Sequence, residues 1–516
     1  MRTQTLGSLA LALGLLTAMP AADAGLFDSN GYPSEGRAID QLKPATDYSE
    51  ALKGRPLALG IMRTRGQGFV PSPALQRYVH GIMMKLLAGV TLPASFHPEI
   101  RILAAPAYAG ECTPDGTLIL TVGLLERLET EDELAFVLGH ELAHAIYRHH
   151  TPDWYKKAQY FAVVHGTAFD TVTQSAALTL GGSVGGNIAR GLNVAQHLAK
   201  LSSNVLMPQM ERDQEDQADA LGFDLMVKAG YDPEAPFAVM DSLARQEAEA
   251  KRAADAAKAA KEKDSGDSSL LGGLGAVGGL VGTLAMGGRP SSDQIADVAI
   301  FAFDTAVDNM AEDATAHHPA TERAELLSDY IYRAYRHVRP VEPTPLPWSV
   351  QSKSPLKRPL TALLAHYSDA EDAAAYVADP ASSTPTKAHN DVVTATASPT
   401  SDHAYTQYAA SEYYTHQQEP ARSEAALRKA VAGPEPSWEV YSKLIDIDMA
   451  RNDYAGAQAL MDQAVTRFQD SPVLLPKRIQ ILHKLGRDAD AEALIPKCKS
   501  YDIDALTDQC KKSLKA

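Results

Sequence analysis

Apolar residues recur at helical spacing in two segments, which predicts two helices that each bury one face. The first spans residues 130–150, where Thr130 and Glu133 form a capping box at the start. Its apolar stripe consists of Leu134, Leu138, Leu142 and Ala145. The second spans residues 211–229 and is closed by Gly230.

Two shorter runs are apolar and rich in β-branched residues, and they predict strands. They are residues 99–104 (EIRILA) and 117–122 (TLILTV). Residues 247–264 are rich in Ala, Lys and Glu and predict a solvated helix. Together these elements predict a mixed α+β unit over residues 25–345, mostly helical with a small sheet.

Two glycine-rich tracts interrupt this unit. Residues 171–189 and 270–288 each contain 19 residues without a charge, and the second tract has eight glycines. Their length permits a membrane span. Glycine at this density lowers helix propensity and hydrophobicity, which favours a loop or plug, with the second tract forming an insert at about 265–290. Contact with a membrane is left open.

The C-terminal part of the chain is repetitive. Residues 346–403 are predicted to connect two domains, with a linker or long loop at 380–403, which is rich in Pro, Ser and Thr. Residues 451–460 (RNDYAGAQAL) match 485–494 (LGRDADAEAL) at an offset of 34. This period resembles tetratricopeptide repeats, so 404–516 is predicted to be all-α. It would be either a peptide-binding surface or a plain helical array.

Length and charge narrow the classes of protein. A chain of 516 residues is too long for one small module and predicts at least two domains. The formal net charge is −16, and no block of basic residues occurs. The charge therefore argues against electrostatic capture of nucleic acid or of anionic lipid.

The first 24 residues resemble a signal peptide. Arg2 precedes an apolar run at 6–19, and Ala22-Asp23-Ala24 fits a cleavage site. No cysteine follows the run, so we expect an exported, soluble protein, periplasmic in a bacterium. The chain has three cysteines. Cys498 and Cys510 are close enough in sequence to pair, which leaves Cys112 unpaired.

The sequence Gly139-His140-Glu141-Leu142-Ala143-His144 contains an HExxH motif on the first predicted helix. Residues four apart share a helix face, so both imidazoles can bind one metal ion. Zinc prefers this pair and, in a catalytic site, adds a third protein ligand and keeps one position open. We therefore predict one Zn²⁺ per chain, with Glu141 as the general base for water.

The third ligand is expected from the acidic helix at 211–219, although spacing alone does not choose among its carboxylates. Glu215 and Asp219 share a face with Gly222, where a missing side chain would let the two helices approach closely. This favours Glu215 as the ligand and Asp219 as an acceptor that orients a ligand histidine. A solvated acidic face is the alternative. His149 and His150 fall off the ligand face and suggest a role at the helix end, near the negative pole of its dipole.

Four segments together resemble the HtpX-like and CAAX-prenyl-protease-like zinc metallopeptidases. They are 123–126 (GLLE), 131–144 (EDELAFVLGHELAH), 215–219 (EDQAD) and 229–233 (AGYDP). The resemblance implies a gluzincin of zincin-type fold, in which Glu215 is the third ligand and Asp219 the buried acid. With an export signal and C-terminal repeats, the chain is similar to the periplasmic BepA-like branch.

The resemblance also adds candidates of lower rank. His318 begins an HPATER segment similar to one in this family, where such a histidine can close the open zinc position, so it is a candidate regulatory ligand; a histidine at a turn is the alternative. Arg323 is expected either to form a buried ion pair or to aid the transition state. Where relatives usually carry an Asn-Ala pair, residues 107–112 read AYAGEC, so the Asn is absent. Cys112 becomes a candidate inhibitory ligand, with a buried or disulfide-linked thiol as the alternative.

These features predict a periplasmic zinc endopeptidase that degrades misfolded or misassembled outer-membrane and envelope proteins and assists their assembly. The repeats would recruit unfolded substrates and contact the outer-membrane assembly machinery. The alternative is a chaperone or assembly platform whose zinc site is latent or structural.

Overall fold

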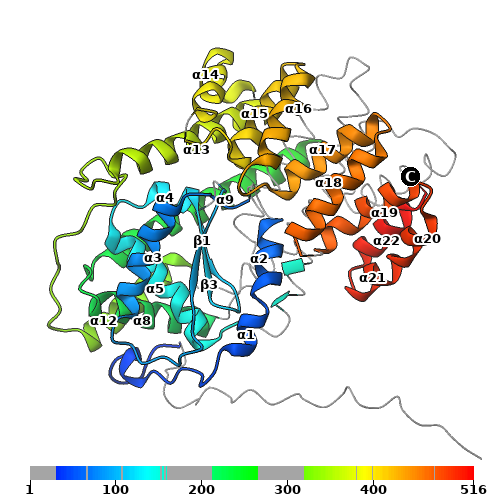
Figure 1. Ribbon diagram of the computed structural model, residues 1–516. Coiled ribbons are helices and arrows are strands. Elements are labelled where there is room, and N and C mark those ends of the chain that lie inside the picture. The colour runs from blue at the N-terminus through cyan, green and yellow to red at the C-terminus, as the bar shows by residue number, and fades with distance from the viewer. Residues whose placement is uncertain are drawn as a thin grey trace, which may run out of the picture.

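The computed structural model describes residues 31–64, 68–105, 108–150, 154–155, 158–159, 212–264, 319–378, 380–397, 399–469 and 471–515. Over these ranges the chain is mostly helical, with one small sheet in the N-terminal half and paired helices in the C-terminal half (Figure 1). The expected signal peptide at 1–24 and both glycine-rich tracts lie outside the described residues.

The sheet has three strands in the order β1-β3-β2. Strand β1 (Glu99–Leu103) pairs in parallel with β3 (Thr117–Thr121), and β2 (Gly110–Cys112) pairs with β3 in antiparallel fashion at the sheet edge. The first and third strands were predicted, whereas β2 was missed. Three residues are too few to show the alternation by which a strand is recognised in sequence.

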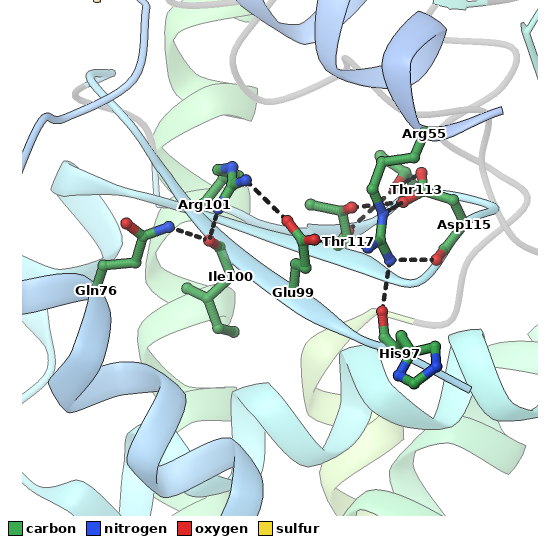
Figure 2. A network of polar contacts seen from close by, with 9 residues as sticks. All are labelled: Arg55, Gln76, His97, Glu99, Ile100, Arg101, Thr113, Asp115 and Thr117. Atoms are coloured by element: carbon green, nitrogen blue, oxygen red, sulfur yellow. Dashed lines mark hydrogen bonds and ion pairs between the residues drawn. The ribbon is translucent and has the colours of Figure 1, made fainter. Parts of the chain in front are cut away.

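A buried polar network fixes the turn between β2 and β3 (Figure 2). The Asp115 carboxylate, whose side chain is fully buried, accepts hydrogen bonds from the hydroxyls of Thr113 and Thr117 at 2.7 and 2.6 Å. Arg55 donates to the same carboxylate at 2.6 Å and to Glu99 on β1 at 2.7 Å. The buried charge is thereby paired, and the position of the edge strand is set.

Helices surround the sheet in the N-terminal half. They are α1 (Ser49–Lys53), α2 (Arg55–Arg63), α3 (Pro73–Leu87), α4 (Val122–Arg127), α5 (Glu131–Tyr147), α8 (Arg212–Lys228), α9 (Ala235–Asp264) and α12 (Ala320–Ala334), with the 3₁₀ helix η1 (Ala38–Gln41). The two predicted amphipathic helices are α5 and α8. The stripe residues Leu134, Leu138 and Leu142 are fully buried, and Thr130 caps α5 as predicted. Gly230 ends α8 with a φ of +81°.

The C-terminal half consists of paired helices in which each packs against the next. They are α13 (Lys357–Ala378), α14 (Pro385–Ala395), α15 (Ala404–His416), α16 (Pro420–Ala432), α17 (Trp438–Ala450), α18 (Tyr454–Arg467), α19 (Leu475–Lys484), α20 (Asp488–Ala493), α21 (Ile495–Ser500) and α22 (Asp504–Ser513), with the 3₁₀ helices η3 (Pro380–Ser382) and η4 (Pro472–Leu474). Cys498 and Cys510 form a disulfide that joins α21 to α22.

The prediction of a linker or long loop at 380–403 was wrong, because helix α14 occupies much of this segment. The Thr384 side chain accepts a hydrogen bond from the Lys387 amide, and Pro385 fills the first helical position. A threonine cap followed by proline starts a helix, so these residues mark a helix N-terminus. Ala388, Val392 and Ala395 are buried, and α14 packs on α13 and α15.

The two halves touch along α2. A Cβ atom on Gly60 of α2 would lie 2.9 Å from the Phe468 carbonyl oxygen, which leaves room only for glycine. Arg63 forms an ion pair with Glu435 at 3.2 Å, and Arg467 lies 3.4 Å from the same carboxylate. No helix within the described ranges has both the length and the apolar character needed to cross a bilayer.

Candidate active site

The HExxH motif lies in the second half of α5, where it faces α8. The Nε2 atoms of His140 and His144 are 3.0 Å apart, and each lies 3.5 Å from an oxygen of the Glu215 carboxylate. The three residues offer ligand atoms that all lie within 4.8 Å of one another. Two imidazole nitrogens and a carboxylate oxygen are a donor set that zinc prefers. The residues therefore fit a zinc ion.

Two glycines allow α5 and α8 to approach this closely. A Cβ atom on Gly222 would lie 2.7 Å from the His140 backbone nitrogen, and one on Gly139 would lie 2.7 Å from the Gly222 carbonyl oxygen. Real Cβ contacts are not this short, so both positions require glycine. The role predicted for Gly222 is thus visible in the structure. Gly139 was quoted in the motif, but its part in the contact was missed.

Asp219 lies behind the cluster and contacts His140. Its Oδ1 is 2.9 Å from His140 Nδ1, the ring atom that points away from the cluster. Arg323 from α12 donates two hydrogen bonds to the same carboxylate, at 2.7 and 2.9 Å, and lies 3.3 Å from Glu215. Of the two roles considered for Arg323, the structure shows the buried ion pair.

The electrostatics of the cluster favour a cation. Burial alone would raise the pKa of Glu215, but the His140 hydrogen bond and Arg323 outweigh it and lower this pKa well below its usual value. Burial opposes a charge on His140, but Asp219 and Glu215 outweigh it and raise the pKa of this imidazole to about 10. Metal binding at His140 would therefore compete with a proton.

Glu141 lies next to the ligand histidines and beside the edge strand. Burial raises the pKa of its carboxyl to about 7. A Cβ atom on Gly110 of β2 would lie 3.2 Å from Glu141 Oε1, so the strand backbone passes close to this carboxylate. A carboxylate that titrates near neutrality is suited to accept and return a proton.

His149 and His150 follow the C-terminal end of α5, as predicted. His149 Nδ1 lies 2.9 Å from His144 Nδ1, while His150 Nε2 donates to the Cys112 carbonyl oxygen at 2.6 Å. Burial lowers the pKa of each imidazole to about 4. Neither therefore carries the charge that an interaction with the helix dipole needs, and the contact between His149 and His144 was missed.

Cys112 is not part of the described metal-ligand cluster. Cys112 is buried with a free thiol, and burial raises its pKa well above the usual value, which makes it a poor thiolate ligand. In the described part of the chain the metal-ligand group contains only His140, His144 and Glu215. His318 lies outside the described residues.

The fold and the site together define a zincin-type metallopeptidase: an HExxH helix, a glutamate from a second helix and an edge strand beside them. The model of peptidase family M48 matches residues 73–330, which is half of the chain, and the protein belongs to this family. Both predicted zinc-site helices and Arg323 lie within the matched residues.

Two relatives carry the same printed name. The chain is 26% identical over 152 residues to the mitochondrial metalloendopeptidase OMA1 of Arabidopsis thaliana, covering 30% of this chain and 27% of that protein. It is 25% identical over 194 residues to the mitochondrial metalloendopeptidase OMA1 of Schizosaccharomyces pombe, covering 37% of this chain and 51% of that protein. The matches thus span about half or less of these relatives.

Proposed function

We propose that this protein is a zinc-dependent endopeptidase. The observation that carries the proposal is the convergence of His140, His144 and Glu215 within 4.8 Å, with the Glu141 carboxylate beside them. Membership of peptidase family M48 and the similarity to two proteins named metalloendopeptidases support it.

The residues divide the chemistry between them. A zinc ion, when bound, supplies a Lewis acid for the scissile carbonyl and activates water. Glu141 accepts a proton from the attacking water and returns it to the leaving amine nitrogen. Asp219 holds His140 through its Nδ1 atom, so that Nε2 faces the cluster, and Arg323 keeps Asp219 ionised and in place.

Strand β2 offers a place for an extended substrate. Ala109 is hydrogen-bonded to Thr121 of β3, and Thr113 is hydrogen-bonded to Thr117 of β3. Antiparallel strands alternate between hydrogen-bonded and non-hydrogen-bonded pairs, so the amide and the carbonyl of Gly110 face away from β3. Gly110 also lies beside Glu141. A peptide that adds to this edge as a strand would bring a backbone carbonyl near the cluster, with little regard for its side chains.

The test is a comparison of the protein with its Glu141→Gln variant. Glutamine preserves the shape of the side chain but cannot accept the proton, so we expect equal zinc content and a loss of cleavage of at least about a hundredfold. Zinc content by metal analysis and cleavage of an unfolded casein-like substrate are the measurements. Cleavage by both forms at one rate would refute the role of Glu141.

The location and substrates belong to the same proposal. The signal-like segment at 1–24 supports export to a periplasm, and the absence of a basic block argues against nucleic acid. On this basis the substrates are unfolded or misassembled envelope proteins, with BepA-like action at the outer-membrane assembly machinery. The candidate regulatory role of His318 remains part of this proposal.

The helix spacing supports tetratricopeptide-like repeats at 404–516. Helices α16, α18 and α20 begin at Pro420, Tyr454 and Asp488, at intervals of 34 residues. Two ion pairs follow the same interval: Lys443 contacts Glu412, and Lys477 contacts Asp446 at 2.9 Å. Equivalent positions of successive helix pairs thus make equivalent contacts, as expected of a repeat.

A chaperone or assembly platform is the second candidate. The paired helices from α13 to α22 form an extended region apart from the zinc-site helices, which favours a binding role that does not need hydrolysis. The Glu141→Gln variant separates the two candidates in a deletion strain. If the variant fully restores the deletion strain, the phenotype of that strain is not caused by the loss of proteolysis.

A further inference from the structure

A chain of hydrogen bonds leads from the ligand His144 away from the zinc site. His144 Nδ1 lies 2.9 Å from His149 Nδ1, and His149 Nε2 lies 3.1 Å from Gln217 Oε1 on α8. His144 and His149 are 3% and 6% exposed. The two ligand histidines therefore have different partners, because His140 is held by Asp219.

The end of α5 places His149 under His144. Arg148 adopts a left-handed conformation with φ +58°, which ends the helix and reverses the chain. The His149 amide then donates to the His144 carbonyl oxygen at 3.1 Å. The Tyr147 ring stacks on the His149 ring with centroids 5.3 Å apart and an angle of 18°. The backbone turn and the stacked ring thus hold the second imidazole in one orientation.

Proton positions follow from the ligand geometry. His144 Nε2 faces His140 Nε2 at 3.0 Å and Glu215 at 3.5 Å, so this atom must offer its lone pair to a metal. The ring proton of His144 is then on Nδ1 and points at His149 Nδ1. His149 must accept there, so its own proton is on Nε2 and donates to the Gln217 carbonyl oxygen.

We propose that His149 and Gln217 are positioning residues which hold His144 in the tautomer that presents Nε2 to the metal. The side-chain oxygen of Gln217 can only accept, so it sets the direction of both hydrogen bonds. The more common partner of a zinc-ligand histidine is a carboxylate or a carbonyl. Here a second imidazole stands between the ligand and a side-chain carbonyl. The inference rests on the zinc site of the proposed function.

Matched pairs of variants test this relay, the hydrogen-bonded chain from His144 through His149 to Gln217. Gln217→Met and His149→Phe keep the volume but remove the acceptor, and we expect zinc affinity to fall about 10- to 100-fold. Gln217→Glu and His149→Asn keep an acceptor and should stay within about threefold of the parent. The measurement is the zinc dissociation constant by chelator competition, in the Glu141→Gln background so that self-cleavage does not interfere.

A second measurement reports the tautomers directly. In the histidine-labelled, zinc-loaded parent, a long-range ¹H–¹⁵N correlation spectrum should show His149 protonated on Nε2 and His144 on Nδ1. This needs no substitution at the relay, so it stands even if a variant does not fold. His150→Phe is the control, because His150 contacts the Cys112 carbonyl and not a ligand, and its zinc affinity should match that of the parent.

The outcomes distinguish this inference from the proposed function. Zinc binding by the parent with unchanged affinity in Gln217→Met, or His149 protonated on Nδ1, overturns the relay alone. A parent that binds no zinc overturns the proposed function, whatever the variants do.

Discussion

Arg323 connects the second carboxylate of the site to the metal ligand Glu215. Its guanidinium is buried and donates two hydrogen bonds to Asp219 while lying 3.3 Å from Glu215. Removing one member of a buried ion pair leaves the others uncompensated, which typically costs about 3–5 kcal/mol. The arginine therefore supports both the fold of α12 against α8 and the charge state of the site.

Arg323→Met is predicted to lower the free energy of unfolding of the metal-free protein by about 3–5 kcal/mol. The loss should be smaller with saturating zinc, because the added cation partly compensates the Glu215 charge. Chemical denaturation with and without zinc measures both values. Arg323→Lys is the control, since it keeps the charge but loses the paired hydrogen bonds. Its stability should lie between that of the parent and that of Arg323→Met. Equal losses of stability with and without zinc would contradict the idea that Arg323 and a bound cation compensate the same Glu215 charge.

Single residues of the site were predicted to different extents. The ligands His140 and His144 follow from i, i+4 spacing alone, because one helix carries both. Glu215 lies on a second helix, and spacing alone leaves several carboxylates of that helix open. The face that Glu215 shares with Gly222 favours it, and the family resemblance implies it. The contact of His149 with His144 was not predicted, because the left-handed turn at Arg148 and not the helical period decides the direction of the chain beyond the helix end.

At the scale of elements, the contact between α5 and α8 depends on the glycine pair. Gly222→Ala would place a methyl group 2.7 Å from the His140 backbone nitrogen, so the two helices must separate. Overpacking of this kind costs about 1–3 kcal/mol, and the separation would also move Glu215 away from the histidines. We predict lower stability together with weaker zinc binding.

Gly81→Ala supplies the matched control for that prediction. Gly81 lies on an exposed face of α3, and a Cβ atom there meets no described atom within 4 Å. Alanine in an exposed helix position should raise stability by about 0.5–1 kcal/mol and leave zinc affinity unchanged. Thermal unfolding and chelator competition on both variants give the answer. A stable, fully zinc-binding Gly222→Ala would show that the helices do not need to pack so closely.

The elements themselves were predictable where a local pattern is strong. The helix with the HExxH motif and the strands at 99–103 and 117–121 follow from periodicity and capping. Strand β2 was not predictable, because it is short and is defined by its pairing with β3 and by the bond of Arg55 to its turn. Helix α14 was hidden by a composition typical of linkers, although Thr384 and Pro385 are a helix start.

At the scale of the whole molecule, the two halves are joined by contacts between residues far apart in sequence. Arg63 of α2 forms an ion pair with Glu435, which lies between α16 and α17, and Gly60 of α2 packs against the Phe468 carbonyl oxygen. No local pattern announces such contacts, so the sequence predicted two regions but not their junction.

Glu126 is a titratable group at this junction. It lies on α4, which packs on α13, and burial together with Glu371 and Asp372 of α13 raises its pKa to about 7. Its Oε1 atom is buried without a hydrogen-bond partner among the described residues. Because the folded pKa exceeds the usual 4.5, folding takes up a proton between about pH 4.5 and 7. Stability should therefore fall as pH rises through this window.

Glu126→Gln removes the charge and should abolish that part of the pH dependence. We predict that the variant is more stable than the parent by about 1–3 kcal/mol at pH 8, with the difference approaching zero near pH 4.5. Denaturation at several pH values measures the two curves. Glu234→Gln at an exposed position is the control for loss of one negative charge, and should run parallel to the parent. The opposite result would be a stability difference between Glu126→Gln and the parent that favours the variant more at low pH than at pH 8. It would mean that Glu126 is ionised and stabilising in the folded chain, so that the junction between the halves does not bind a proton there.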